Sequence, residues 1–165
     1  MIDKDVLWKG QFYNKIPGAI HLNNKDEVPQ ISLKYASKFT CDKSKCYIHE
    51  KLFPETYIMQ DPSDCKKIIK ILTEQQQKSL KNIQWIGKIA RGVHQGKGVE
   101  IFTAEKISQF LSEYDHGAKC DSGPDKPYIV QKYIENPFLL NGRKFEFRVY
   151  FYIVSLDPYL VLFHM

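Results

Sequence analysis

Ten residues near the end of the chain alternate between apolar and polar or tyrosine side chains, and this segment constrains the fold most strongly. Residues 144–153 place Lys144, Glu146 and Arg148 at every second position, with phenylalanine, valine or isoleucine at the positions between them. Successive side chains of a strand point to opposite faces. We therefore predict a long strand that begins at Lys144, with one apolar face and one face bearing a cation, an anion and a cation. Such a strand is either a surface strand with cross-strand ion pairs or one wall of a nucleotide site.

The remainder of the chain predicts a mixture of short strands and amphipathic helices, and hence an α+β fold. One helix begins after Ser63, and another begins after Thr103 and ends near Gly117, each with a hydroxyl side chain suited to capping its first turn. Turns are predicted at residues 141–142 and 157–158, and a polar loop at residues 118–126. Apolar residues recur at helical spacing in both helices: Cys65, Ile68, Ile69, Leu72, Leu80, and Ile107, Phe110, Leu111, Tyr114. The predicted strands cover residues 55–60, 84–88, 99–102, 128–133 and 159–164.

A glycine-bearing loop at residues 91–98 follows Lys88, which lies at the end of a predicted buried strand. Glycines let backbone N–H groups approach phosphate oxygens, and a lysine can reach the same anion. The loop is not a Walker A loop, because the spacing from Gly92 to Gly96 is one residue short and Gly98 occupies the position of the Mg²⁺-binding Ser or Thr. Nor does it fit the dinucleotide-binding fingerprint. A phosphate flap and a plain hairpin turn both remain open.

The four cysteines are widely spaced, and we expect them to be reduced thiols of a cytosolic protein. Cys41, Cys46 and His49 could form part of a zinc site, but the gap between the two cysteines is wide and no second ligand pair follows at finger spacing. No apolar run approaches the roughly 20 residues needed to cross a bilayer. The first ten residues lack the apolar region of a secretory signal.

The formal net charge of +5 is compatible with an acidic partner: nucleic acid, an anionic membrane face or an acidic protein tail. For a charge of this size on 165 residues, a solvated surface is the preferred explanation. Nucleic-acid binding rests on charge alone, and no membrane partner is predicted.

Five short segments, in order along the chain, closely resemble the signature of the tubulin tyrosine ligase-like family. Gln-Lys-Tyr-Ile-Glu-Asn-Pro at residues 131–137 is similar to the family's Gln-Lys/Arg-Tyr-Ile-x-x-Pro. Gly-Arg-Lys-Phe-Glu-Phe-Arg at residues 142–148 is similar to its Gly-x-Lys-Phe-Asp-hydrophobic-Arg. The other three segments are Phe-Pro-Glu-Thr-Tyr at 53–57, Trp-Ile-Gly-Lys at 85–88 and Gln-Gly-Lys-Gly at 95–98.

The resemblance implies an ATP-grasp fold, in which two α+β lobes close on ATP. It divides the chain into an N-terminal region (residues 1–80), a central lobe with the phosphate flap (81–133) and the start of a C-terminal lobe (134–165). The chain reaches Met165 on an apolar strand, and we expect it to be a fragment. In the family, the Mg²⁺ ligands and the arginine that recognises the amino acid lie beyond this position, so no metal-binding residue is assigned, and the chain alone should not turn over.

Carried over position by position, the resemblance also implies a set of ATP-binding residues. Lys88 would contact phosphates beneath the flap, and Lys144 would hold phosphate. Glu146 would replace the family's ribose-contacting aspartate, and Arg148 would support phosphate or the activated acyl group as the catalytic residue. The flap residues would be Gln95 and Gly96, and the adenine hinge would be Gln131, Lys132, Tyr133 and Ile134.

The implied reaction uses ATP to activate a carboxylate on a tubulin tail, which the amine of a free amino acid then attacks. The hinge and flap segments are closest to glutamate-adding members; a glycine-adding ligase and a non-catalytic microtubule-binding remnant are the alternatives. Ile89 in place of the usual proline and Glu146 in place of aspartate depart from the family pattern. The family implies a cytoplasmic, cytoskeletal location, with the cilium, axoneme or basal body as possible sites.

Overall fold

The computed structural model describes residues 16, 18–36, 53–78, 85–92 and 97–164. By its contacts the chain divides into two compact units, residues 1–133 and 134–165, and each is described by itself.

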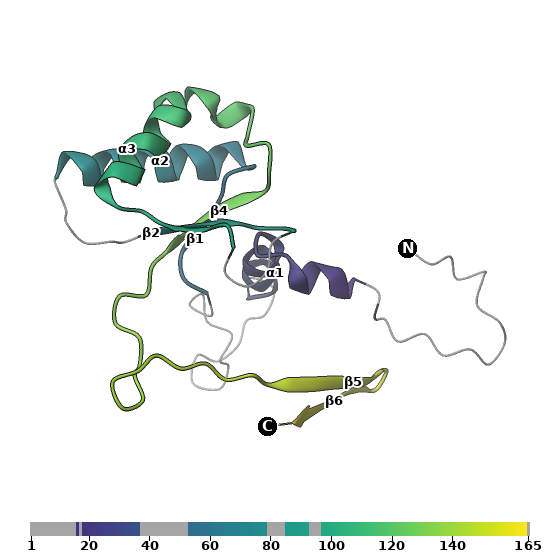
Figure 1. Cartoon of the computed structure of the whole chain (residues 1–165). Coiled ribbons are helices and arrows are strands. Elements are labelled where there is room, and N and C mark those ends of the chain that lie inside the picture. Colours follow the sequence, from purple (N-terminus) through teal and green to yellow (C-terminus); the bar gives the residue numbers. More distant parts are fainter. Residues whose placement is uncertain (1–15, 17, 37–52, 79–84, 93–96, 165) are drawn as a thin grey trace. The chain divides into compact units, whose positions relative to one another are not determined.

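Unit 1 contains a four-stranded antiparallel sheet in the order β1-β4-β2-β3. Strand β1 spans Thr56–Ile58, β2 Trp85–Ile89, β3 Val99–Ile101 and β4 Tyr128–Lys132. These positions confirm the four strands predicted for this part of the chain: β1, β3 and β4 are slightly shorter than predicted, and β2 is shifted by one residue. β4 lies between β1 and β2, so it joins segments that are far apart in the sequence (Figure 1).

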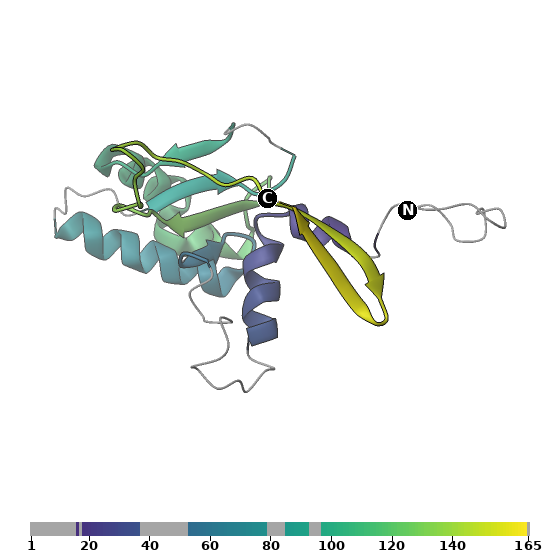
Figure 2. The ribbon, with the colours of Figure 1, turned by 90° about the horizontal axis from the view of Figure 1, so that it is seen from below.

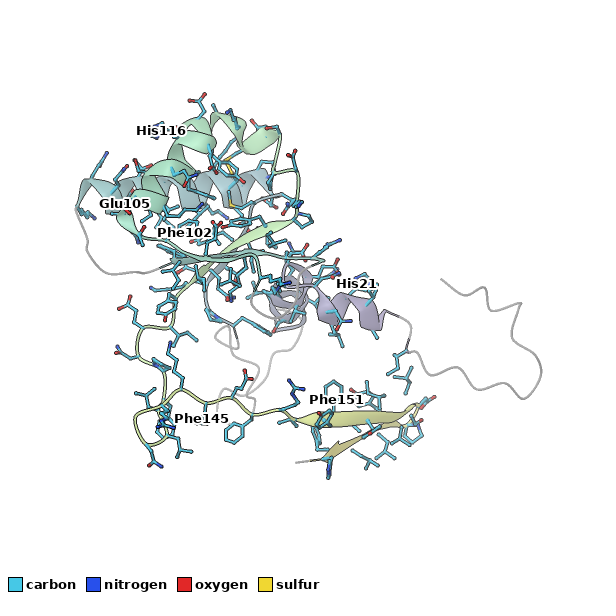
Figure 3. All side chains as sticks on the ribbon, viewed as in Figure 1. His21, Phe102, Glu105, His116, Phe145 and Phe151 are labelled. Atoms are coloured by element: carbon cyan, nitrogen blue, oxygen red, sulfur yellow. A yellow bond between two sulfur atoms is a disulfide. The ribbon has the colours of Figure 1, made fainter. Side chains whose placement is uncertain are left out.

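Two helices cover one face of this sheet, as Figure 1 shows and the view from below in Figure 2 repeats: α2 (Pro62–Gln77) and α3 (Ala104–Glu113). Both predicted stripes form the core: Cys65, Ile68, Ile69 and Leu72 of α2, and Phe110, Leu111 and Tyr114 at α3, are buried against Trp85, Val130 and Phe102. Phe102 lies between the sheet and α3 (Figure 3), and its ring centroid is 5.0 Å from that of Phe110. Leu80, predicted on the same stripe, lies outside the described residues.

Of the two predicted helix caps, one is confirmed and the other is wrong. Thr103 caps α3 as predicted, since its side chain accepts a hydrogen bond from the Lys106 amide. Ser63 does not cap α2: the Asp61 carboxylate accepts from the amides of Ser63 and Asp64, at 2.8 and 3.0 Å. Pro62 then occupies the first turn, where its missing N–H costs nothing and its fixed φ suits the helix.

A disulfide joins Cys65 of α2 to Cys120, with a Cα–Cα distance of 5.6 Å (sulfur atoms in yellow, Figure 3). The prediction of reduced cysteines is therefore wrong for this pair. The prediction of a plain polar loop after Gly117 is also wrong, because a 3-10 segment, η3 (Asp115–Asp121), carries Cys120 into the core, where it is fully buried. Cys41, Cys46 and His49 lie outside the described residues, so the zinc alternative stays untested.

The N-terminal part of unit 1 contains the 3-10 segment η2 (Ala19–Asn23) and helix α1 (Glu27–Ala36). The turn between them docks on the end of β2: the Lys25 amide donates to the Ala90 carbonyl. This turn brings the start of the described chain to the residues that precede the glycine loop.

Unit 2 contains a hairpin of β5 (Tyr150–Leu156) and β6 (Tyr159–His164), as predicted around Asp157 and Pro158. Asn141 and Gly142 form the predicted turn, with positive φ angles of 50° and 74° and a bridge between the residues on either side. The long strand predicted from Lys144 is wrong in its first half, because β5 begins only at Tyr150. Tyr150 pairs with His164, the last described residue of β6, so residues 144–149 find no partner backbone among the described residues.

Candidate functional site in unit 1

The sheet of unit 1 has a second face, which carries Thr56, Lys88 and Gln131 and which we call the site face. Gln131 pairs with both Ile86 and Thr56, and Lys88 pairs with Ile129. Paired residues of antiparallel strands, and residues two apart on one strand, point to the same side. Trp85, Gly87 and Val130 therefore point toward the helices, and Lys88 and Gln131 point away from them.

A chain of hydrogen bonds crosses the site face. The Lys88 ammonium donates to Gln131 Oε1 at 2.6 Å, and Gln131 Nε2 donates to Thr56 Oγ1 at 2.8 Å. The Thr56 hydroxyl donates in turn to the Pro54 carbonyl at 2.7 Å. Gln131 is buried, with 9% of its surface exposed, so both ends of its amide are fixed by these partners. The network holds the Lys88 ammonium in one place on the sheet.

The charged form of the Lys88 side chain is electrostatically unfavourable in this position. Burial lowers the pKa of Lys88 below its usual value, and the positive charge of Lys25 lowers it further. Its hydrogen-bond partner is a neutral amide, and in the described part of the chain it forms no ion pair. An anion at this position would stabilise the charged form of Lys88.

Arg91, at the base of the glycine loop, is tied to the N-terminal turn. Its guanidinium donates to both oxygens of Asp26 and to Glu27, with closest distances of 2.7 and 2.6 Å. The hydrogen bond from Arg91 to Asp26 raises the pKa of Arg91, and the charges of Asp26 and Glu27 act in the same direction. Asp26 is buried, so this fork satisfies a carboxylate that would otherwise be costly to bury.

The glycine-bearing loop ends at Gly98, directly before β3, where a backbone hydrogen bond joins it to β2. The Ile89 amide donates to the Gly98 carbonyl at 2.8 Å, and Gly98 has a φ of +67°. A Cβ there would meet the Ile89 side chain at 2.8 Å, so the position requires glycine for its conformation and for space. The predicted flap residues Gln95 and Gly96 lie outside the described residues.

The predicted hinge runs off the end of β4. The Lys132 amide donates to the Glu55 carbonyl at 2.8 Å, and the Lys132 side chain is exposed. Tyr133 is partly buried and ends unit 1, whereas Ile134 is exposed and begins unit 2. The structure thus places Lys88 and Gln131 together on one face, with the backbone of Lys132 at the end of the inner strand β4 of the same sheet.

The remaining predicted residues, Lys144, Glu146 and Arg148, belong to unit 2 and precede β5 in an extended, exposed segment. Phe145 and Phe147 between them are also exposed, at 39% and 83%, so the apolar side expected for this segment is not buried in unit 2. Their assignment to a nucleotide site stays a prediction.

Neither composition nor spacing distinguishes Lys25, Asp26 or Arg91 as site residues in the sequence. Lys25 and Asp26 sit in an Asn-Asn-Lys-Asp-Glu run that has the composition of an ordinary surface turn. No signal in that run indicates that it meets β2, more than sixty positions away. Among the described residues there is also no group of three or more His, Cys, Asp or Glu side chains that could hold a metal ion.

The sequence matches the family described as Tubulin-tyrosine ligase family over residues 3–165, and the chain belongs to this family. Its α+β architecture is that of an ATP-grasp-like domain. No helix in the described part of the chain is both long enough and apolar enough to cross a membrane.

Three relatives illustrate the range of the family. The chain is 28% identical to mouse protein polyglycylase TTLL10 over 80% of its length and 19% of the relative's. It is 26% identical to human tubulin monoglutamylase TTLL4, over 90% of its own length and 10% of the relative's. It is 28% identical to the probable alpha-tubulin polyglutamylase Ttll1 of Tetrahymena thermophila, over 90% of its own length and 36% of the relative's. The chain thus spans between a tenth and about a third of these relatives.

Proposed function

We propose that this chain is the nucleotide-binding part of an ATP-dependent ligase that joins an amino acid, glutamate, to the acidic tail of tubulin. The observation that carries the proposal is the Lys88 ammonium, held by Gln131 on the site face without a carboxylate partner among the described residues. Family membership and relatives named as tubulin-modifying enzymes support it.

The residues of the site face fit the triphosphate of ATP. Lys88 offers hydrogen-bond donors and positive charge, and the adjoining loop supplies glycines at 92 and 98 with positive φ angles of 74° and 67°. Such backbone lets N–H groups turn toward an anion. Phosphate binding by a positioned lysine beside a glycine loop is a common arrangement in nucleotide sites.

Each predicted residue then has a proposed role. Lys88 orients the phosphates, and Gln131 fixes Lys88 in position. Lys132, Tyr133 and Ile134 contact adenine at the hinge, and Gln95 and Gly96 cover the phosphates. The roles proposed for Lys144, Glu146 and Arg148 are those that the family signature implies: phosphate binding, ribose binding and stabilisation of the reacting acyl group.

The protein's share of the reaction is positioning and electrostatic stabilisation. When bound, ATP supplies the phosphoryl group that activates a tail carboxylate for attack by the amine of the amino acid. The Mg²⁺ that accompanies ATP in such reactions is expected to bind residues elsewhere in the protein. Tubulin tails are rich in glutamate, so the net charge of +5 favours their approach. We place the protein on the cytoskeleton, with the cilium as a candidate site.

Glycine addition is the second candidate, and the similarity to a polyglycylase favours it. Both functions are tested by one experiment. The longest natural form of the protein is incubated with Mg-ATP, tubulin and an equal mixture of glutamate, glycine and tyrosine, and the tubulin tails are analysed by mass spectrometry.

We expect glutamate on the tails, lost in Lys88→Met and retained in Lys70→Met, a matched change at an exposed lysine of α2. Glycine on the tails would support the second candidate. Tubulin binding that needs no ATP, with no residue added, would contradict the ligase function and indicate a non-catalytic microtubule-binding protein.

A further inference from the structure

The Gln131 side chain lies between Lys88 and Thr56 on the site face, and its two amide ends have opposite hydrogen-bonding character. The oxygen of a carboxamide accepts and the nitrogen donates, yet the two ends are nearly equal in size and shape. A half-turn of the amide would therefore fit the same space but would point the NH₂ group at the Lys88 ammonium. Two donors would then face each other, so the orientation of the amide decides whether Lys88 has an acceptor.

The Pro54 carbonyl determines this orientation through the Thr56 hydroxyl. A carbonyl only accepts, so the single hydroxyl proton of Thr56 is donated to Pro54, at 2.7 Å. The Thr56 oxygen then has only lone pairs to offer to Gln131, and it accepts from the amide nitrogen at 2.8 Å. The amide oxygen is thereby left facing Lys88, at 2.6 Å. A backbone carbonyl before β1 thus sets the direction of the whole chain of hydrogen bonds.

The strand register brings Thr56 next to Gln131 although Thr56 lies on the outer strand β1. The two residues are directly opposite in the ladder of β1 and β4, and the side chains of such a pair are neighbours on one face. Thr56 is partly buried and Gln131 is buried, so the network is shielded from water at its centre. A hydroxyl on an outer strand therefore acts on a lysine two strands away.

Lys88 depends on this acceptor because its charged form is already disfavoured. Burial lowers the pKa of Lys88, and the charge of Lys25 lowers it further. An amide oxygen that accepts from the ammonium favours the charged form, whereas an amide NH₂ group facing it would favour the neutral amine. The orientation of Gln131 therefore affects whether Lys88 offers a positive charge to an anion.

We propose that Thr56 is a positioning residue for Lys88: its hydroxyl, oriented by the Pro54 carbonyl, holds the Gln131 amide with its oxygen toward the ammonium group. Thr56 acts through Gln131, and no contact with a ligand is assigned to it. The inference rests on the proposed function for the nature of the anion that Lys88 binds.

The test compares Thr56→Val, which removes the hydroxyl and keeps the shape, with Thr56→Ser, which keeps the hydroxyl. Thr73→Val is the matched control, because Thr73 also donates to a backbone carbonyl, that of Ile69, but lies on α2, which covers the other face of the sheet (Figure 1). Binding of Mg-ATP and of adenosine to the longest natural form of the protein is measured by calorimetry. We expect Thr56→Val to weaken Mg-ATP binding about fivefold, the effect of one lost hydrogen bond, with adenosine unchanged. Thr56→Ser should bind both ligands like the wild type.

A second readout needs no ligand. The pKa of Lys88, followed by NMR of its side chain in the ligand-free protein, should be lower in Thr56→Val than in the wild type and unchanged in Thr56→Ser and Thr73→Val. A mere loss of packing would have the opposite sign, because water entering the site would raise the pKa of Lys88 toward its ordinary value.

A Thr56→Val protein with the same Lys88 pKa and the same Mg-ATP affinity as the Thr73→Val control would overturn the inference. Equal weakening of Mg-ATP binding in Thr56→Val and Thr56→Ser would do the same, because the hydroxyl would then be irrelevant. The two proposals fail separately. A wild-type protein that binds no Mg-ATP would contradict the proposed function, whereas a lowered pKa of Lys88 in Thr56→Val would still support the role of Thr56.

Discussion

The Lys88 ammonium on β2 donates a 2.6 Å hydrogen bond to the Gln131 side chain on β4, across 43 positions of the sequence. The two residues are not directly paired, because Lys88 lies opposite Ile129 and Gln131 lies opposite Ile86. The contact is therefore diagonal across the ladder, and it depends on the register of β2 against β4. Any change in that register would separate the lysine from its acceptor.

Replacing Gln131 with leucine should lower both stability and nucleotide affinity. The change leaves Lys88 without its acceptor and the Thr56 hydroxyl without a donor. We expect the free energy of unfolding to fall by about 1–3 kcal/mol, the usual cost of an unsatisfied polar group, as measured by urea denaturation. Gln76→Leu, at an exposed position of α2, is the control. Equal losses in the two variants would contradict the structural role of the network.

The stability of the protein should rise with pH on account of Lys88. Its pKa is lowered in the folded protein by burial and by Lys25, so in alkaline solution the unfolded chain binds more protons at this site than the folded chain. Stability increases with pH wherever the unfolded state holds the additional proton. The penalty from charged Lys88 is thus fully present below its folded-state pKa and is relieved as the pH approaches about 10.4, the ordinary lysine value.

The measurement compares the free energy of unfolding of the wild-type protein and of Lys88→Met between about pH 7 and pH 10.4. The difference between them should shift in favour of the wild type as the pH rises, and the comparison cancels groups common to both proteins. A difference that stays constant with pH would show that the folded protein does not disfavour the charged lysine.

Gly87→Ala should destabilise unit 1 although alanine is a small residue. A Cβ at Gly87 would lie 1.7 Å from the Tyr128 hydroxyl and 2.7 Å from the Phe102 ring. We expect a loss of about 1–3 kcal/mol, typical of overpacking in a core, measured by thermal or urea unfolding. The double variant Gly87→Ala/Tyr128→Leu should lose less than the sum of the single losses. Strictly additive losses would exclude Tyr128 as the residue in conflict.

Reduction of the disulfide between Cys65 and Cys120 should lower the unfolding temperature. The bond closes a loop between residues 55 positions apart, and such a constraint contributes about 2–4 kcal/mol by limiting the unfolded chain. Wild-type protein with and without a reductant is compared by calorimetry. The double variant Cys65→Ala/Cys120→Ala should show no response to the reductant, and a similar response in both proteins would assign the effect to other cysteines.

Arg91→Met should loosen the N-terminal turn, because it leaves the buried Asp26 carboxylate without its guanidinium partner. Amide hydrogen exchange should accelerate in α1 and in the turn before it, and remain unchanged in α2. Arg91→Lys keeps the charge but loses the two-pronged contact, so its effect should be intermediate. Unchanged exchange in Arg91→Met would mean that the turn is held by other contacts.

Features that depend on neighbouring residues could be predicted from the sequence without a structure. The apolar spacing predicted both core helices, from Cys65 in the first and from Ile107 in the second, and Thr103 predicted the start of the second. Asn141 and Gly142 specified a turn, because few other residues adopt positive φ so readily. The family signature likewise consists of short segments whose order along the chain is visible without a structure.

Which distant groups come into contact depends on how the helices and strands pack, and the sequence did not predict it. Cys65 belongs to the apolar spacing of α2, whereas Cys120 lies in a segment predicted to be a polar loop, and only the packing of α2 against η3 brings the two together. The alternation from Lys144 satisfied every local condition for a strand, yet a strand also requires a partner backbone, and the described part of β6 supplies one only from Tyr150 onward. Lys25 reaches the Ile89 carbonyl in a turn that a partly buried ion pair between Asp26 and Arg91 ties to the end of β2, and such long-range pairing leaves no periodic signal in the sequence.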